Sequence, residues 1–189
     1  MAIEQKSSPP PFYLPGDQKD RNDMATLYRV NQAGELGAVE IYRGQLHGIK
    51  NPNPETTSIL SEMQQHEEEH FAEFNQLISN QQTRPSLFHP IWKKLGFAIG
   101  FLTARSGIPS AMSLTVAIED EINEHYLEQL ARLDPTSPLA KKIEKFRLDE
   151  LEHRDTAIEQ GAKDMKFYKT FYPMVRRLSR LAINIAKKL

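Results

Sequence analysis

The chain has 189 residues, 39% of them hydrophobic, which is enough to bury one core and demands no second domain. Its net charge of -1 argues against a general nucleic-acid binder. It contains no cysteine, which excludes disulfides, thiolate zinc sites and cysteine-ligated iron–sulfur clusters, and leaves nitrogen and oxygen as metal ligands.

The N-terminal segment differs in composition from the rest of the chain. Residues 1–19 lack the apolar run of a signal peptide and are rich in proline, so we expect a flexible lead. Residues 20–189 show helical spacing of apolar residues and no strand pattern. We therefore expect one helical domain over 20–189.

The first predicted helix runs from about residue 20 to residue 47, with Glu35 near its middle. Gly34 and Gly37 lie inside it and should each cost about 1 kcal/mol relative to Ala. We therefore expect another helix or a ligand to come close to these two glycines.

A second helix is predicted from Pro54, with Asn53 as its N-cap, to about residue 82, and it carries Glu67 and His70. The next segment, 90–105, is apolar except for two lysines. Only ten uncharged residues, 95–104, separate the charges, against the ~20 that a membrane-spanning helix needs.

Two further helices are predicted beyond the Ser106–Gly107 break. One runs from about residue 109 to residue 133 and contains Glu119. The other opens at Pro138, ends near Gly161, and carries Glu150 and His153.

The last segment, 163–189, holds eight Lys or Arg and one Asp. Its apolar residues recur at intervals of three and four, as on one face of a helix. Packing on the bundle would explain the apolar stripe alone. Together with segment 90–105, the basic charge favours amphipathic helices at a membrane interface.

One set of metal-ligand types occurs twice in this chain. Glu35, Glu67 and His70 return 84, 83 and 83 positions later as Glu119, Glu150 and His153. Residues three apart lie on one helix face, so a Glu-x-x-His pair can close on one ion. Two single glutamates and two such pairs, from four helices, are the ligand set of the ferritin-like dimetal bundle.

The sequence His66-Glu67-Glu68-Glu69-His70 also fits the H-E-x-x-H zinc-protease motif. The repeat argues against that reading, because Asp149 stands where the second copy would need the matching histidine. The zinc reading also leaves Glu35, Glu119 and Glu150 without a role. We expect His66 not to bind metal, and Glu68, Glu69 and Glu152 to face solvent.

Charge and donor type favour iron or manganese. Four carboxylates neutralise two divalent ions, and uncompensated buried charge is very costly. Carboxylate and imidazole donors suit both metals. Glu67 and Glu150 are the best candidates to bridge the ions. One ion would then have Glu35, Glu67, His70 and Glu150 as ligands, and the other Glu67, Glu119, Glu150 and His153.

Several motifs together resemble those of the demethoxyubiquinone hydroxylases, over about residues 23–189. They are Val30-Asn31-Gln32-Ala33-Gly34-Glu35, Glu67-x-x-His70, Leu95-Gly96-Phe97-Ala98, Val116-Ala117-Ile118-Glu119 with His125-Tyr126, and Phe146-Arg147-x-x-Glu150-x-Glu152-His153. The joint order of these motifs is far more specific than any one of them.

The resemblance implies a di-iron monooxygenase of ubiquinone biosynthesis. Its substrate would be 2-polyprenyl-3-methyl-6-methoxy-1,4-benzoquinol, hydroxylated at ring position 5 with O2. No nucleotide-binding fingerprint is present, so the reductant must come from outside, and the resemblance suggests NADH. It also implies a peripheral membrane protein, on the cytoplasmic face of the inner membrane if bacterial, and leaves a homo-oligomer or a biosynthetic complex open.

One motif departs from the family pattern. Relatives carry Asp-His where Asn31-Gln32 stand, and Gln32 can donate a hydrogen bond near Glu35 but cannot take up a proton as His would. His125 and Tyr126 could orient a ligand or the quinone, or could be ordinary core residues.

Two other functions would fit the same ligands. A ferritin-like iron-storage or peroxide-scavenging protein would need no apolar surface or basic tail. A non-enzymatic quinone or lipid carrier would not need the metal.

Overall fold

The computed structural model describes residues 17–188, and side chains from residue 23 onward. Helices dominate this part of the chain, which contains no strand. The elements are α1 (Asp17–Gly48), α2 (Pro54–Asn80), α3 (His89–Ser106), α4 (Ile108–Leu130), α5 (Pro138–Glu159), the 3-10 helix η1 (Ala162–Asp164) and α6 (Tyr168–Lys188). The expected lead lies outside the described residues up to residue 16, whereas residues 17–19 already belong to α1.

The local sequence explains where the helices begin. The Asn53 side chain accepts a hydrogen bond from the Thr56 backbone N–H at 2.7 Å, and Ser137 accepts one from the Ala140 N–H at 3.1 Å. Each cap satisfies a backbone donor that the first turn leaves free, and a proline follows it where no N–H is needed.

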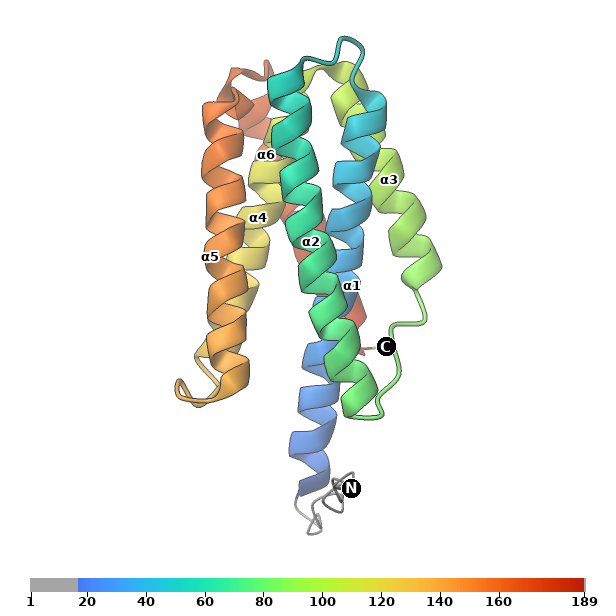
Figure 1. The fold of residues 1–189 in the computed structure, drawn as a ribbon, viewed down its shortest axis with the longest axis vertical. Coiled ribbons are helices and arrows are strands. Elements are labelled where there is room, and N and C mark those ends of the chain that lie inside the picture. The colour runs from blue at the N-terminus through green and yellow to red at the C-terminus, as the bar shows by residue number, and fades with distance from the viewer. Residues whose placement is uncertain (1–16, 189) are drawn as a thin grey trace, which may run out of the picture.

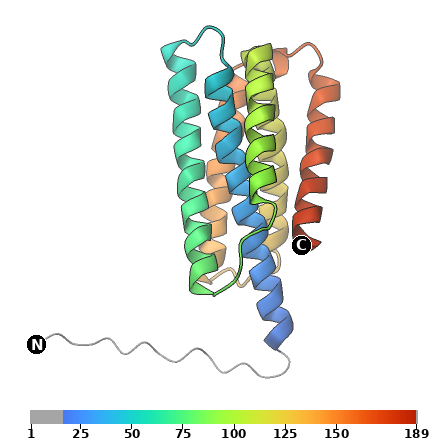
Figure 2. The same cartoon turned by 90° about the vertical axis from the view of Figure 1, so that its right-hand side faces the viewer.

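Helices α1, α2, α4 and α5 form the expected four-helix bundle, with α3 and α6 added outside it (Figure 1). Figure 2 shows that the main helices run side by side, with the long α2–α4 connection carrying α3. Buried polar contacts also join α1 to α4, including Gln45 to the Ala111 carbonyl oxygen at 3.1 Å. The all-α ferritin-like architecture is confirmed.

Two apolar clusters occupy the two ends of the bundle. One includes Leu60, Met63 and Met112, and the other includes Phe74 and Phe146. On α2, the middle of the helix between these clusters holds polar side chains that are fully buried. The fold therefore places a polar layer between two apolar ones.

Helix α3 lies against α1 along a glycine seam formed by Gly44, Gly48, Gly96 and Gly100. A Cβ atom at any of the four would collide with a backbone oxygen of the other helix. The expected approach of another helix to Gly34 is wrong, because the space around it is open. At Gly37, α3 does come near through Gly96, but a Cβ on Gly37 itself would meet nothing.

The outer faces of α3 and α6 are apolar. Exposed rows run along them: Leu87, Ile91, Leu95, Ile99 and Leu102 on or just before α3, and Phe167, Met174, Leu178, Leu181 and Ile185 on or just before α6. On α6 the stripe therefore points away from the bundle, and Val175 and Ala186 lie on the packed side. Among the described residues, no helix is long and apolar enough to cross a membrane.

Candidate metal centre

The six predicted ligands converge in the middle of the bundle. They are Glu35 from α1, Glu67 and His70 from α2, Glu119 from α4, and Glu150 and His153 from α5. None is more than 2% exposed. Helix geometry explains the pairing, because each Glu-x-x-His pair projects from one face of its helix.

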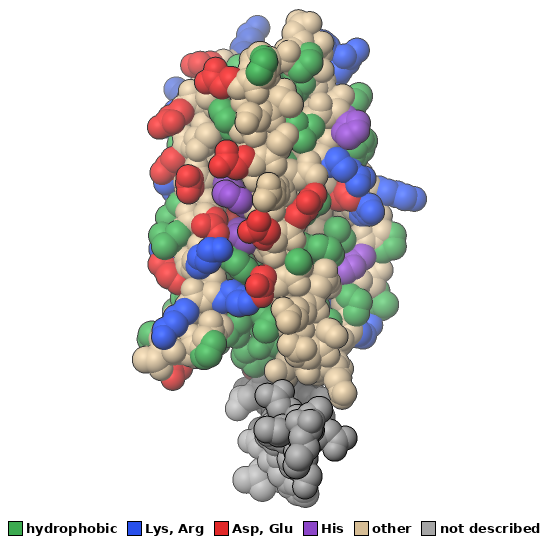
Figure 3. Space-filling model, in the orientation of Figure 1, with side chains coloured by type: hydrophobic (Ala, Val, Ile, Leu, Met, Phe, Trp, Pro, Cys, Tyr) green, Lys and Arg blue, Asp and Glu red, His purple; other side chains and the backbone are tan. Residues whose placement is uncertain are grey.

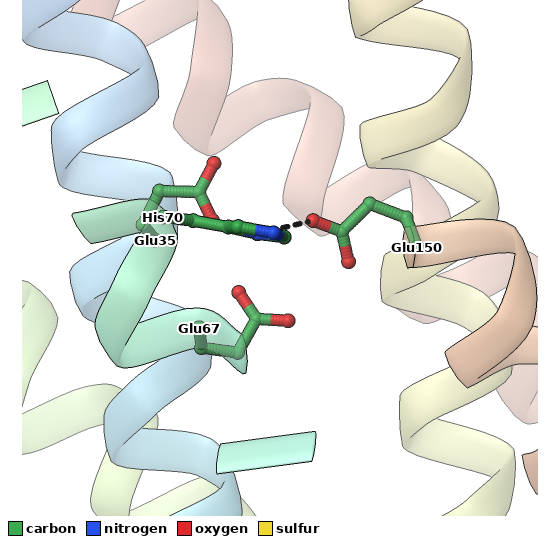
Figure 4. A group of neighbouring side chains, drawn as sticks. All are labelled: Glu35, Glu67, His70 and Glu150. Atoms are coloured by element: carbon green, nitrogen blue, oxygen red, sulfur yellow. Dashed lines mark ion pairs between the residues drawn. The ribbon is translucent and has the colours of Figure 1, made fainter. Parts of the chain in front are cut away.

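Two overlapping groups of four can be drawn among these side chains. One is Glu35, Glu67, His70 and Glu150, and the other is Glu67, Glu119, Glu150 and His153. Within each group the donor atoms lie within 4.8 Å of one another. Figure 4 shows the first group, with its side chains pointing into one space between α1, α2 and α5. Glu67 and Glu150 belong to both groups, as bridging ligands would.

Both imidazoles present Nδ1 to the centre. The Nδ1 atom of His70 is 3.2 Å from a Glu150 oxygen and 3.8 Å from a Glu35 oxygen. The Nδ1 atom of His153 is 3.2 Å from Glu67 and 3.4 Å from Glu150. Donors of both kinds therefore surround each of the two positions.

The donor set fits two divalent cations. Both oxygens of Glu67 and of Glu150, one oxygen each of Glu35 and Glu119, and Nδ1 of both histidines are buried without a hydrogen-bond partner. Buried polar atoms left unpartnered cost free energy, and so many in one place call for a shared partner. Two metal ions would satisfy all of them and balance the four carboxylates.

Without metal, the close packing of these groups raises the pKa of several of them, so that they keep their protons. Burial, and then the charges of Glu150 and Glu35, raise the pKa of Glu67 well above its usual value. Burial followed by Glu150 and Glu67 does the same to the pKa of Glu119. Burial lowers the pKa of His70, but the close approach of the Glu150 and Glu35 carboxylates outweighs burial and raises that pKa to about 12.

Nε2 of each of the two histidines contacts a side chain of the other helix of the α2–α5 pair. Nε2 of His70 is 3.0 Å from an oxygen of Asp149 on α5. Nε2 of His153 is 3.1 Å from Nδ1 of His66 on α2. Such contacts fix the orientation of a metal-binding imidazole. His66 is thus directed at His153 and not into the centre.

Two tyrosines support the terminal glutamates from the opposite helix. The Tyr42 hydroxyl on α1 donates to Glu119 on α4 at 2.6 Å, and the Tyr126 hydroxyl on α4 donates to Glu35 on α1. Tyr126 was a candidate to orient a ligand, whereas Tyr42 was missed. The signal for it was in the sequence, because each tyrosine follows its own helix's glutamate by seven residues.

Other predicted neighbours of the site do not reach a ligand. Gln32 donates to Asn75, and Asn31 exchanges hydrogen bonds with Gln129. His125 contacts the Gln129 amide nitrogen at 2.7 Å, and burial, with smaller effects of Lys187 and Arg132, lowers the His125 pKa to about 4. Glu68, Glu69 and Glu152 are exposed, as expected.

The bundle and the buried carboxylate–imidazole cluster define the chain as a ferritin-like protein with two overlapping groups of side chains that could hold metal. The chain belongs to the family described as ubiquinone biosynthesis protein COQ7, whose sequence profile matches residues 22–186. The family resemblance noted from the motifs is thereby confirmed.

Curated relatives bear hydroxylase names. The chain is 38% identical to the 3-demethoxyubiquinol 3-hydroxylase of Rhodospirillum rubrum, over 93% of this chain and 82% of the relative. It is 38% identical, over 89% of this chain and 78% of the relative, to a mitochondrial NADPH-dependent 3-demethoxyubiquinone 3-hydroxylase from Dictyostelium discoideum. The human protein of that name is 33% identical, over 92% of this chain and 81% of the relative.

Proposed function

We propose that this protein is a 3-demethoxyubiquinol hydroxylase, a di-iron monooxygenase that adds the ring hydroxyl at position 5 of 2-polyprenyl-3-methyl-6-methoxy-1,4-benzoquinol. The observation that carries the proposal is the buried set of six ligands with unpartnered donor atoms. Relatives with hydroxylase names over most of the chain support the substrate class.

The six residues are proposed to hold the ions as two four-residue groups that share Glu67 and Glu150. Iron bound there would supply the activation of O2. Tyr42 and Tyr126 hold the carboxylates of Glu119 and Glu35 in place, and the two apolar clusters exclude bulk water above and below the site.

The proposed reaction needs electrons from outside the chain. One oxygen atom of O2 enters the ring and the other leaves as water, which requires two electrons beyond those of the C–H bond. The sequence offers no nucleotide-binding fingerprint. A reduced nicotinamide is the proposed donor. NADH is the expectation from the resemblance, whereas several relatives are named NADPH-dependent.

A peripheral position on a membrane is part of the proposal, because a polyprenyl substrate resides in lipid. The exposed apolar rows of α3 and α6 support it, as do Lys169 and Arg177 beside Met174 and Leu178 on α6. In a bacterium the surface would be the cytoplasmic face of the inner membrane. An iron-storage protein has no need for such rows.

The direct test uses the purified protein loaded anaerobically with iron. Given O2, a reductant and a short-tailed demethoxyquinol, it should form the hydroxylated quinol, measured by liquid chromatography with mass spectrometry. Iron stored in a soluble cage without product would favour the storage function instead. Binding of quinone with well under two ions per chain would favour the carrier.

We predict that Glu67→Ala or Glu150→Ala abolishes hydroxylation, because a ligand shared by both groups is lost. The helical circular dichroism signal should persist, since the surrounding clusters remain. Glu68→Ala is the matched control, because Glu68 is the exposed neighbour of Glu67. Metal content per chain, measured by elemental analysis, should fall in the first two variants and not in the control.

A further inference from the structure

The two halves of the centre are related by a repeat in the sequence. The ligands correspond at offsets of 84 and 83, and the tyrosines Tyr42 and Tyr126 correspond at 84. Each tyrosine donates to the glutamate of the opposite half. The metal-facing side chains and these hydroxyl donors are therefore the same in both halves.

The repeat is broken at the residues that contact Nε2 of the two histidines. His66 and Asp149 correspond at the offset of 83, and each directly precedes a shared glutamate. Asp149 lies 3.0 Å from Nε2 of His70, and His66 lies 3.1 Å from Nε2 of His153. The same place in the two halves is thus filled by a carboxylate in one and an imidazole in the other.

The direction of both hydrogen bonds follows from geometry. With an ion held at Nδ1, which faces the centre in each of these histidines, Nε2 would carry the ring proton and donate it. Asp149 accepts that proton with a carboxylate oxygen. His66 can accept it only as a neutral ring, through the lone pair of Nδ1, and its ring lies within 18° of parallel to the ring of His153.

The two acceptors differ in what they do to the ligand. A carboxylate that accepts from a metal-bound imidazole makes the imidazole a stronger donor to the metal, and charge-assisted hydrogen bonds are stronger than neutral ones. A neutral imidazole fixes the ring but adds no charge. Lys145 lies 3.9 Å from Asp149 but is 68% exposed, so water screens much of its effect.

We infer that the two metal positions are unequal, and that the position beside His70 binds its ion more tightly than the position beside His153, because Asp149 supports one and His66 the other. This inference rests on the proposed dimetal function. Asp149 and His66 are positioning residues, since each acts through the histidine that it contacts.

The test is a titration of the metal-free protein with Mn²⁺, in which electron paramagnetic resonance counts the free ion. The wild-type protein should bind two ions in two resolved steps. Asp149→Asn should weaken the tighter step by about 10- to 100-fold, the usual range for loss of such a partner. His66→Asp should tighten the weaker step, so that the two steps move together.

Two controls separate this effect from general charge. Glu152→Gln removes one carboxylate from the exposed face of α5, and Gln65→Asp adds one to the exposed face of α2. Both should leave the two steps unchanged. Circular dichroism and thermal unfolding establish that each variant is folded, and either of the two substitutions at the site decides the question if the other fails to fold.

The outcomes are distinct. Two ions bound with both steps unaffected by Asp149→Asn and by His66→Asp would overturn the inequality and leave the dimetal centre standing. Folded wild-type protein that binds no Mn²⁺ would overturn the centre itself, and the inequality with it. Opposite shifts of the two steps in the two variants would establish the inference.

Discussion

Tyr42 and Tyr126 are the side chains through which α1 and α4 hold each other's glutamate. Each hydroxyl lies on a buried carboxylate oxygen, Tyr42 on Glu119 and Tyr126 on Glu35. Removing a hydroxyl would leave that oxygen buried without a donor, which costs about 1–3 kcal/mol. The tyrosines therefore fix the positions of the terminal carboxylates.

We predict that Tyr42→Phe and Tyr126→Phe each weaken metal binding by about 10-fold or more, because the glutamate is no longer held. The two effects should be similar, since the contacts are equivalent. Tyr28→Phe is the control, because Tyr28 is buried but does not contact a ligand. Mn²⁺ titration measures the metal affinity of all three variants. An equal loss of affinity in Tyr28→Phe would contradict the positioning role of the other two tyrosines.

The metal-free site also predicts how stability depends on pH. The His70 pKa is raised from 6.5 to about 12, through nearby carboxylates that outweigh burial, and burial raises the pKa of Glu67 and Glu119. A group with a raised pKa stabilises the folded state below its unfolded-state pKa, and this contribution is lost as pH rises through the folded pKa. Glu150 has the opposite sign. Burial raises its pKa, but the nearby imidazoles of His70 and His153 outweigh burial and lower it, so its contribution to stability is lost as pH falls below 4.5.

The chelated protein should therefore melt at progressively lower temperature as pH rises from 6.5 toward about 12, the interval between the unfolded-state and folded-state pKa of His70. Bound ions replace the protons, so the metal-loaded protein should depend less on pH over this interval. Thermal unfolding followed by circular dichroism checks this. If the melting temperatures of the chelated and metal-loaded proteins changed equally with pH, protons would not be replacing the metal ions in the site.

At the level of helices, the glycine seam between α1 and α3 differs from the glycines beside the site. A Cβ at Gly44 would strike the backbone of Phe97 and Phe101, which cannot move aside as a flexible side chain could. Around Gly34 the space is open. In the same helix, a side chain would therefore collide with α3 at Gly44 but would find free space at Gly34.

We predict opposite signs for the same substitution at these two positions. Gly44→Ala should destabilise by about 1–3 kcal/mol, as overpacking does. Gly34→Ala should stabilise by up to about 1 kcal/mol, because Ala favours the helix. Urea unfolding of both variants in the presence of a chelator measures the difference without a contribution from metal. Destabilisation by Gly34→Ala would indicate a contact that the open space does not account for.

The sequence predicts the helices well, and it predicts which side chains gather in the buried carboxylate–imidazole cluster, because both depend on local spacing. The bounds of α2 and α5 agree with the predicted starts at Pro54 and Pro138, and the Glu-x-x-His spacing places the ligands on one face. Tertiary packing decides which glycines of α1 meet another helix. The close contact with α3 is therefore at Gly44, whereas the sequence pattern had suggested Gly34. The contacts of Tyr42 and His66 follow the same offset as the ligands, and that signal was overlooked.

The direction of the α6 stripe could not be read from the sequence. Apolar residues at helical spacing are equally compatible with packing and with exposure. In the structure α6 packs on α4 through Val175, which lies against Leu114 and Ala117. It is also held by Arg176 and Arg180, which pair with Glu121 and Glu124 on α4 at 2.5–3.1 Å. These pairs leave the apolar row free. The division of the chain into a lead and one domain over 20–189 stays a prediction.

For the whole molecule, the clustered acidic side chains and the exposed apolar rows belong to different helices. Acidic side chains gather over α2 and α5 on the face shown in Figure 3, whereas α3 and α6 pack on α1 and α4 and carry the exposed apolar rows. An anionic lipid surface would repel the first face and attract the basic residues of α6. On the proposed membrane surface, the molecule would therefore have a preferred orientation.

We predict that replacing Leu178 and Leu181 together by Asp weakens binding to anionic liposomes by about 10-fold or more, because buried apolar area is lost. Leu148→Asp on α5 is the control, since Leu148 is 52% exposed on another helix. Arg177→Glu should also weaken binding. Co-sedimentation with vesicles is the measurement, and equal losses in all variants would remove the claim for α6.

Charge reversal at Arg176 or Arg180 should have a different effect from charge reversal at Arg177. Both arginines pair with carboxylates of α4, so their reversal should loosen α6 from the bundle rather than simply reduce its charge. Protease sensitivity of the C-terminal segment would report this. Its absence, with reduced liposome binding alone, would mean that the two arginines serve the membrane.

The repeat of ligands and tyrosines has a bearing on ancestry. Helices α1–α2 and α4–α5 are two hairpins, and each supplies a glutamate, a Glu-x-x-His pair and a tyrosine. Two copies of a single hairpin, associated about a two-fold axis, would present the same six ligands. This is the arrangement that duplication and fusion of such a hairpin would leave, with α3 in the segment that joins the copies. In a symmetric pair of identical hairpins, the positions of His66 and Asp149 would have to hold the same residue, whereas in one chain they can differ.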